Sequence, residues 1–312
     1  MSEQKEDRPF PIITVTRRIV QILSFFAVNL IALELIFSID LSVFTDQIIP
    51  YPFIHTPRDA WSTGAGMFEF MLFSLARGEV PYLLMGLFFL IVLITARFFC
   101  GWVCPVGFIQ DILAAIPGKP KRVKIETDKS LKKVKTYIIV FLIIVMIFFG
   151  AIWNINQQLW VEWKFALGQF LERPLAGFSL SEFLFNTLHN KIQIIWQGTG
   201  DPLFDNTWQV LGFIFYIVIL ILSAYYPRFY CRTLCPYGAA AAFVSDYSAL
   251  RLGRNPVKCV GRRECGICEK VCPMQIRILD EPFEGFTGEG ECILCGRCKE
   301  ACPYDAIELN FG

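Results

Sequence analysis

Charged residues are scarce in this sequence of 312 residues: they make up 18% of it, whereas soluble globular proteins carry about a quarter. Acidic and basic residues nearly cancel, and the net charge of +1 gives no reason to expect a nucleic-acid partner. Apolar residues reach 54%, and 30 of the residues are phenylalanine. This composition is unusual for a soluble protein and indicates contact with lipid.

Cysteine is missing from long parts of the chain, including residues 38–99 and 105–230, although the chain has twelve cysteines in all. An even number of cysteines is typical of disulfide-stapled proteins, but those are small secreted scaffolds. Here the cysteines fall into tight local groups, as metal ligation requires. The sequence therefore favours metal ligation over disulfides.

Histidine is almost absent, since His55 and His189 are the only two. Both fall between the apolar runs described next, in segments expected outside the membrane. A haem held by two histidines within the membrane is therefore excluded. His55 lies near Arg58 and Asp59 and is a candidate base in a quinone site, although an ordinary loop histidine is the simpler interpretation.

Four apolar runs are long enough to cross a bilayer, which takes about 20 helical residues. They are Ile19–Phe37, Tyr82–Phe99, Thr136–Trp153 and Val210–Tyr226. The first follows Arg17-Arg18, as a twin-arginine signal peptide would. Its apolar run is too long for such a peptide and no small-residue cleavage site follows, so we interpret it as an uncleaved first span.

Basic residues in the connections predict the orientation of these spans. Residues 118–135 hold eight basic and two acidic residues, whereas residues 38–81 hold two and five, and residues 154–208 hold three and five. The basic segments face the cytoplasm in most membrane proteins. The sequence therefore predicts a multi-pass protein of the cytoplasmic membrane with both termini and all cysteine groups on the cytoplasmic side.

The second and fourth spans end in nearly the same text, RFFCGWVCPVG at residues 97–107 and RFYCRTLCPYG at residues 228–238. The pattern repeats at an offset of 131 residues. Each copy closes a unit of two spans and an outer segment. Two such units in parallel predict a pair related by an axis along the membrane normal.

Each copy of this CxxxCP motif offers two sulfurs on one helix face, because its cysteines are four residues apart. They are Cys100 and Cys104 in one copy, and Cys231 and Cys235 in the other. Proline suits the first turn of a helix, so the second cysteine of each copy should lie at a helix N-terminus, which lowers a thiol pKa. Four thiolates can hold one metal centre or form redox-active disulfides. The alternative is that these cysteines are buried and have only a structural role.

Near the C-terminus, Cys292, Cys295, Cys298 and Cys302 form the C-x2-C-x2-C-x3-C-P run of bacterial ferredoxins. In such a run three cysteines bind one [4Fe–4S] cluster and the fourth binds its neighbour. Zinc sites favour paired CxxC groups at longer separation. This spacing therefore predicts iron–sulfur clusters.

A second group precedes it, with a longer first gap. Its members are Cys259, Cys265, Cys268 and Cys272. We expect Cys259 to be a ligand on a longer loop; a three-iron cluster or a fourth ligand other than cysteine is the alternative. By the crossed pattern, cluster 1 takes Cys259, Cys265, Cys268 and Cys302, and cluster 2 takes Cys272, Cys292, Cys295 and Cys298. Short strands around Ile276–Leu279 and Ala306–Leu309 would complete a ferredoxin-like domain.

Paired CxxxCP motifs followed by a dicluster tail resemble the NapH-type membrane ferredoxin family, whose relatives include NosR and CcoG. The resemblance covers nearly the whole chain. It implies electron transfer between the quinone pool and a partner redox enzyme. A covalent flavin is not expected, because Ser62–Gly66 (STGAG) has glycine at the position where a flavin-attachment motif needs its acceptor threonine.

One ionisable residue, Glu34, falls within the first span. Such groups are costly in lipid and are functional candidates, here for proton uptake in quinol chemistry. Because Glu34 lies near the outer end, a carboxylate at the interface is an equal interpretation. The outer segments also contain two apolar stretches, Met67–Ala76 and Trp160–Leu171, which could lie along the interface or dock a partner.

The sequence thus predicts an all-α polytopic membrane domain of four transmembrane helices in two parallel repeats at residues 1–250. A small α+β dicluster ferredoxin-like domain follows at residues 251–312. The predicted function is electron relay between quinone or quinol and a partner redox protein. Two alternatives stay open: a copper or disulfide reductase that acts in the assembly of another enzyme, and a redox-sensing regulator.

Overall fold

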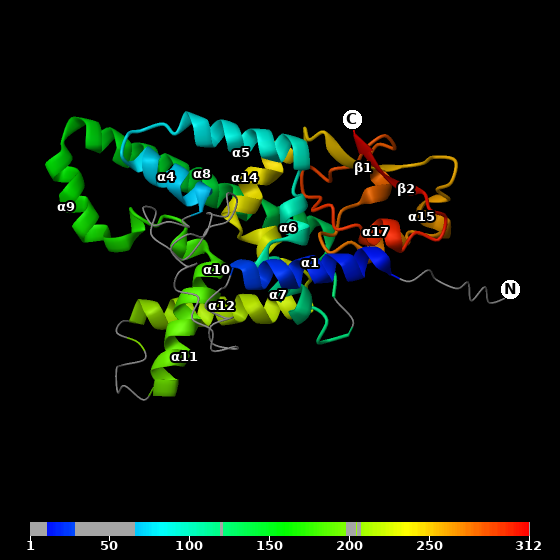
Figure 1. The fold of residues 1–312 in the computed structure, drawn as a ribbon, viewed down its shortest axis with the longest axis horizontal. Helices are drawn as coiled ribbons and strands as arrows, with labels where there is room; N and C mark the ends of the chain where they lie inside the picture. Colours follow the sequence, from blue (N-terminus) through cyan, green and yellow to red (C-terminus); the bar gives the residue numbers. More distant parts are fainter. Residues whose placement is uncertain (1–10, 29–65, 119–120, 198–203, 205–206, 312) are drawn as a thin grey trace.

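The computed structural model describes residues 11–28, 66–118, 121–197, 204 and 207–311. These residues are mostly helical, and the C-terminal part lies at one end of an elongated molecule (Figure 1). The α-helices are α1 Ile12–Val28, α4 Met67–Ala76, α5 Tyr82–Thr95, α6 Phe98–Trp102, α7 Pro105–Leu113, α8 Ile125–Ile155, α9 Gln157–Leu167, α10 Leu180–Glu182, α11 Leu188–Gln197, α12 Thr207–Tyr225, α13 Phe229–Thr233, α14 Pro236–Ser245, α15 Gly261–Glu264, α16 Ile267–Val271 and α17 Arg297–Glu300. The strands are β1 Leu250–Arg254 and β2 Ile307–Phe311.

Two helices of the described residues, α8 and α12, are long and apolar enough to cross a membrane. Most of their apolar side chains face outward. In the most apolar part of each helix, only 28% of the residues of α8 and 17% of those of α12 are buried. Exposed apolar helix faces of this extent are stable in contact with lipid. The structure thus bears out two of the four predicted spans in length and composition.

Of the other two predicted spans, one is shorter in the structure and one is described only in part. Helix α5 begins at Tyr82 as predicted but ends at Thr95, because Ala96 has a φ of 52° and the chain restarts as α6 at Phe98. Helix α1 is described as far as Val28, and the rest of the predicted first span lies outside the described residues. The four-span arrangement therefore stays a prediction.

Helix α4 packs against α8 and is buried, although an interfacial position was one expectation for residues 67–76. The two helices approach closely at Gly150, where a Cβ would overlap the carbonyl oxygen of Leu75. Leu142 and Met146 of α8 are fully buried in this core. Because α4 fills a gap inside the bundle, its apolar residues serve packing.

The C-terminal segment from residue 250 onward, called the tail below, is held together by a two-stranded antiparallel sheet of β1 and β2. Leu250 pairs with Phe311, and Arg254 pairs with Ile307. The prediction of a strand at Ala306–Leu309 is close to β2. The strand predicted at Ile276–Leu279 was wrong: that segment lies outside the sheet and ends in a 3₁₀ turn, Ile278–Asp280. Its alternating apolar residues are buried in the tail core without a strand partner, because β1 takes that place.

Candidate metal centres

The first cavity of the tail is lined by the four cysteines predicted for cluster 1, Cys259, Cys265, Cys268 and Cys302. The longer first gap forms one helical turn, α15, which lets Cys259 reach the same cavity as the other three. The cavity has about 340 Å³ of empty space. Its wall includes Arg254, whose Nη1 lies 3.9 Å from the Cys259 sulfur.

A second cavity is lined by the four cysteines predicted for cluster 2, Cys272, Cys292, Cys295 and Cys298, and has a similar empty space of about 310 Å³. The two cavities are built alike. Gly266 and Gly296 each follow a cysteine and adopt φ values of 66° and 72°, a conformation that favours glycine. Each then begins a short helix, α16 or α17. This internal symmetry is that expected of a dicluster ferredoxin fold.

None of these groups suits a single metal ion. In the described part of the chain, no three Cys, His, Asp or Glu side chains are close enough together to hold one. A zinc ion needs its sulfur ligands about 2.3 Å away. The cysteines line common cavities but stand too far apart to bind one ion. Such an arrangement fits a multi-iron cluster better than zinc.

The four CxxxCP cysteines line a third cavity, although the two motifs are far apart in sequence. It has about 650 Å³ of empty space, roughly twice that of either tail cavity. As predicted, Cys104 and Cys235 are the N-cap residues of α7 and α14, with a proline at the first helical position. The Gly238 N–H donates to the Cys235 sulfur over 3.3 Å.

The residues that the two motifs have in common explain how the copies fit together. The arginine that opens each copy packs against the glycine that closes the other. A Cβ on Gly107 would overlap Arg228, and one on Gly238 would stand 3.0 Å from Arg97 Nη2. A larger residue at either glycine would crowd the arginine of the other copy, so the two motifs make a pair of reciprocal contacts.

Thiol pKa values contradict the prediction made from the helix N-termini. Burial raises the pKa of Cys235 to about 12, nearby Cys231 and Cys100 add to the rise, and the Gly238 N–H lowers it only in part. Burial also raises the pKa of Cys104. The prediction of lowered pKa values was wrong because loss of water around the sulfur outweighs the helix N-terminus.

The second and third cavities share a wall. Ile293 lines both of them. Gly101, which follows the first cysteine of one motif, lies so close to this wall that a Cβ would overlap the Ile293 carbonyl oxygen. The first and second cavities are joined by α16, which carries Cys268 and leads directly to Cys272. The three cavities therefore follow one another, with the Cys272 set in the middle.

Two buried arginines that line the CxxxCP cavity form ion pairs that the sequence analysis missed. Arg228 donates to Asp111 through Nε at 3.0 Å and Nη2 at 2.9 Å. Arg97 donates to Glu291 at 2.7 Å, and Lys135 bonds the same carboxylate. These arginines hold the pKa values of Asp111 and Glu291 low, against the effect of burial. The arginine repeated in both motifs was the available signal, since a buried arginine requires an acidic partner.

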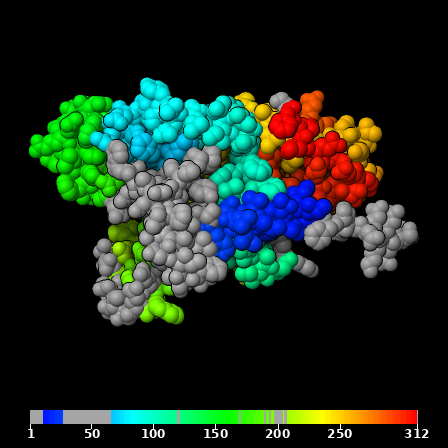
Figure 2. All heavy atoms as spheres, viewed as in Figure 1, coloured from blue at the N-terminus to red at the C-terminus, as the bar shows by residue number. Residues whose placement is uncertain are grey.

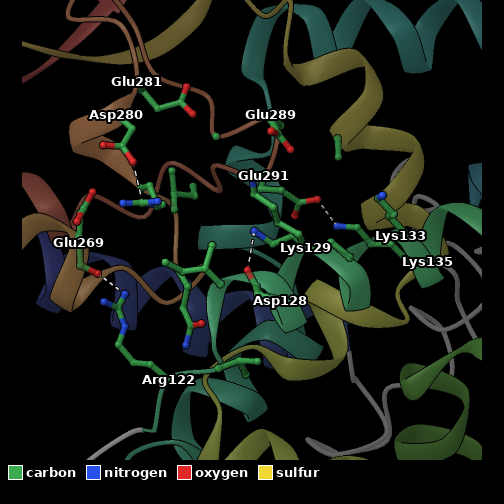
Figure 3. Close-up of a pocket in the computed structure, with 18 of the residues that line it drawn as sticks. Arg122, Asp128, Lys129, Lys133, Lys135, Glu269, Asp280, Glu281, Glu289 and Glu291 are labelled. Atoms are coloured by element: carbon green, nitrogen blue, oxygen red, sulfur yellow. Dashed lines mark hydrogen bonds and ion pairs between the residues drawn. The ribbon is translucent and has the colours of Figure 1, made fainter.

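A wide charged cleft separates part of the tail from the first turns of α8 (Figure 3). Basic residues such as Lys129 and Lys133 lie on the α8 side, and acidic residues such as Asp280 and Glu281 on the tail side. At its inner end, Arg232 of α13 donates to Asp128 of α8 and also, over 3.0 Å, to Gln275 of the tail. These contacts hold the tail against the helical part.

Three further residues were considered in the sequence analysis, Glu34, His55 and His189. Glu34 and His55 lie outside the described residues. His189 lies in α11, at the far end from the tail (Figure 1). Two buried acids escaped notice instead: Glu69 of α4 accepts from the Leu175 N–H at 3.3 Å, and Glu182 pairs with Arg173 at 2.5 Å. They share the order Glu-Phe, in Glu69-Phe70 and Glu182-Phe183, which could have marked a further repeat.

Comparison with known protein families places iron–sulfur domains on the same segments. A 4Fe-4S binding domain family matches the chain twice, at residues 77–124 and 208–255. The matches begin 131 residues apart, the offset of the internal repeat. A 4Fe-4S dicluster domain family matches residues 258–307.

Three curated relatives show the range of similarity. An uncharacterized protein of Methanocaldococcus jannaschii, MJ0749, is 25% identical over 70% of this chain and 65% of its own length. The putative electron transport protein YccM of Escherichia coli is 27% identical over 81% and 63%. The ferredoxin-type protein NapH of Haemophilus influenzae is 26% identical over 69% and 62%. The chain thus spans less than two thirds of each. The regulatory protein NosR also matches, and no solved structure does.

Proposed function

Because the chain belongs to the NapH/NosR-like family of 4Fe–4S polyferredoxins, we propose that it is a membrane-bound protein that relays electrons between quinone or quinol and a partner redox protein. Relatives with the printed names electron transport protein and ferredoxin-type protein support electron transfer in general. The arrangement of the three cysteine cavities supports the relay.

Two [4Fe–4S] clusters would be held by the tail cysteines in the crossed sets. The Cys259, Cys265, Cys268 and Cys302 set lines one cavity, and the Cys272, Cys292, Cys295 and Cys298 set lines the other. When bound, such clusters supply one-electron chemistry with potentials that the protein tunes over roughly −700 to +450 mV. The protein excludes water from these sites, since most of the cysteines are buried or half-buried.

We further propose a third centre at the CxxxCP motifs, held by Cys100, Cys104, Cys231 and Cys235. Its cavity is larger than either tail cavity, so it has room for a cluster and for the edge of a second group. Leu175, Ser179 and Ser181, which come from the segment between α9 and α11, form another part of its wall. This part of the wall would be the quinone end of the relay.

The single observation that carries this proposal is the shared wall at Ile293 between the middle cavity and the CxxxCP cavity. Cysteine-lined cavities that lay apart from one another would favour independent structural sites. Three in sequence, from the exposed tail to the helical part, favour a path for electrons. The order would be tail, middle, CxxxCP centre and quinone, in either direction.

The proposed setting is the cytoplasmic membrane, with four spans, both termini in the cytoplasm and the tail on the cytoplasmic face. Basic residues at the start of α8 support it, because Lys129, Lys132 and Lys133 lie just before the apolar part of that helix and beside the tail. The lipid would contact the outward faces of α5, α8 and α12.

Thiol chemistry at the CxxxCP motifs, as in a copper or disulfide reductase, is less well supported. A reactive cysteine needs a thiolate and access to solvent. Here burial raises the pKa of both N-cap cysteines, and Gln110 Nε2 donates to the Cys231 sulfur at 3.0 Å inside the protein. A closed site of this kind suits ligation.

Separate replacements of Cys100 and Cys231 by serine test the relay. In membranes containing the full chain, quinol-dependent reduction of the tail clusters, followed by EPR, should be lost in both variants. Dithionite should still reduce those clusters. Thr233→Ser is the matched control within the same motif, and it should leave quinol-dependent reduction unchanged. If quinol reduces the tail clusters equally fast in all variants, the proposed path is wrong.

A further inference from the structure

Arg17 of α1 is fully buried, with 0% of its surface exposed. In the described part of the chain, none of its three guanidinium nitrogens makes a hydrogen bond. A buried charge without hydrogen-bond partners destabilises the fold, so a group that accepts hydrogen bonds from it is expected. Arg17 belongs to the Arg17-Arg18 pair noted in the sequence, and no hydrogen bond within the described fold accounts for its buried charge.

The nearest acid does not satisfy Arg17. Its Nη1 lies 3.3 Å from Asp111 Oδ2, as an ion pair without hydrogen-bond geometry. Both oxygens of Asp111 already accept bonds from Arg228, at 3.0 and 2.9 Å. One carboxylate therefore faces two buried arginines, and the charge of Arg17 is left without a counter-ion of its own.

Neighbouring contacts show where the Arg17 side chain lies. One turn before it, Ile13 packs against Gly296, where a Cβ would stand 2.6 Å from Ile13 Cγ2. The Thr14 N–H donates to Glu300 of α17 at 3.1 Å. One turn after it, Gln21 donates to the Gly101 carbonyl at 3.0 Å. Figure 2 shows α1, in blue, lying against the red tail.

Residues 13, 14, 17 and 21 lie on one face of α1, since they are three or four residues apart. Arg17 therefore stands between Gly296, which follows Cys295, and Gly101, which touches the Ile293 wall. Cys295 and Arg297 of this loop both act electrostatically on Arg17, with opposite sign. The unbonded guanidinium therefore lies next to the loop that carries Cys295 and Gly296.

We propose that Arg17 is a positioning residue for the middle centre, donating hydrogen bonds to the sulfurs of a cluster held by Cys272, Cys292, Cys295 and Cys298. A cluster bound by four thiolates is negatively charged, and it supplies the counter-charge that Asp111 does not. Positive charge and hydrogen bonds at the sulfurs favour the reduced form. Arg17 thus makes the middle centre the preferred place for an electron. The inference rests on the proposed function only in requiring a cluster at these cysteines.

The test is an EPR-monitored redox titration of the purified full chain, kept anaerobic, with iron counted in each sample. At a fixed poise, Arg17→Gln should lower the ratio of reduced to oxidised middle cluster about tenfold, which corresponds to about 59 mV for one electron. The other tail cluster should keep its potential. Arg17→Lys, which keeps the charge but fewer donors, should give a smaller shift in the same direction.

Arg18→Gln is the matched control. Arg18 is the next residue, its Nη1 lies 3.5 Å from the same Asp111 oxygen, and its side chain is 29% exposed. It should leave both potentials unchanged. Unchanged potentials in a fully loaded Arg17→Gln variant would overturn the proposal, as would an equal shift in Arg18→Gln.

If Arg17→Gln loses iron, the Lys variant decides. A loaded Lys variant with a lowered potential supports the proposal, whereas loss of iron from both variants, or an unshifted Lys variant, makes Arg17 a packing residue and overturns it. A wild-type chain without a middle cluster would instead mean that the proposed function fails. Iron in the wild type together with unchanged Arg17 variants would leave the proposed function standing.

Discussion

Gly101 lies directly against the carbonyl of Ile293, so the CxxxCP motif of the helical part and the cysteine loop of the tail meet without an intervening side chain. The contact is also fixed from the side, because Trp102 Nε1 donates to the Leu294 carbonyl at 2.9 Å. Two cysteine-lined cavities are brought together at this point, which makes it the junction of the proposed relay.

Gly101→Ala should disturb this junction. The added methyl group overlaps backbone, and overpacking of this kind costs about 1–3 kcal/mol. We expect normal iron content in the tail but slower quinol-dependent reduction of its clusters. Stopped-flow absorbance measures the rate. Gly86→Ala is the control, because a Cβ there meets nothing within 4 Å and the rate should not change. Equal rates in both variants would show that the junction is not on the path.

Asp111→Asn should destabilise the helical part strongly. It leaves Arg228 buried without its carboxylate, and loss of one partner from a buried ion pair costs about 3–5 kcal/mol. We expect a lower thermal unfolding temperature in detergent throughout pH 5–8. Arg18→Gln, at the exposed edge of the same cluster, should change it little. A melting temperature equal to that of the wild type would contradict the importance of this pair.

The same carboxylate predicts the acid limit of stability. The arginines lower the pKa of Asp111 in the folded protein, so its contribution is present above the unfolded pKa of about 3.9 and is lost as the pH falls below that value. The difference in melting temperature between wild type and Asp111→Asn should therefore shrink below about pH 4. A difference that stays constant into acid would show that Asp111 is not ionised when folded.

Cys259→Ser tests the irregular cysteine group. Cys259 lines the first cavity together with Cys265, Cys268 and Cys302. Its loss should therefore affect only the cluster held there. We expect less iron and a changed EPR signal, with the other tail cluster retained. Unchanged iron and EPR would mean that a different group is the fourth ligand. Lys258→Ser, next to it and exposed, is the control.

Removal of iron should leave unreactive thiols if the chain stays folded. Burial raises the pKa of Cys292 and Cys235 to about 12, so both remain protonated at pH 8. Alkylation by iodoacetamide, read by mass spectrometry, should be slow until the protein is unfolded. Thiols in the unfolded chain ionise near pH 8.5, whereas the buried thiols stay protonated. The iron-free fold should therefore lose stability as the pH rises above about 8.5. Fast alkylation of Cys235 at pH 8 would favour the thiol alternative.

Cysteine spacing was the most informative part of the sequence. The spacing and the proline after each group gave cysteine sets that coincide with the linings of the cavities, including Cys259 across its longer gap. The repeated arginine-to-glycine motif predicted two matching units, and the double family match at the same offset agrees with it. Local patterns carry this information because ligand geometry requires fixed spacing.

Other features depend on contacts that no local pattern contains. The pairing of β1 with β2 joins the two ends of the tail, so Ile276–Leu279 had the right alternation but no partner. The thiol pKa values follow from burial by distant segments, not from the helix N-terminus alone. The counter-charge of Arg228 comes from Asp111, across the repeat. Such pairings become visible only when the chain is folded.

Iron content measures the central claim most directly. Anaerobically purified full chain should contain about twelve iron atoms, since three cysteine sets would each hold a cluster of about four. Cys100→Ser or Cys231→Ser should reduce this to about eight and leave the EPR signals of the tail clusters in place. About eight iron atoms in the wild type, unchanged by either substitution, would contradict a metal centre at the CxxxCP motifs and with it the relay.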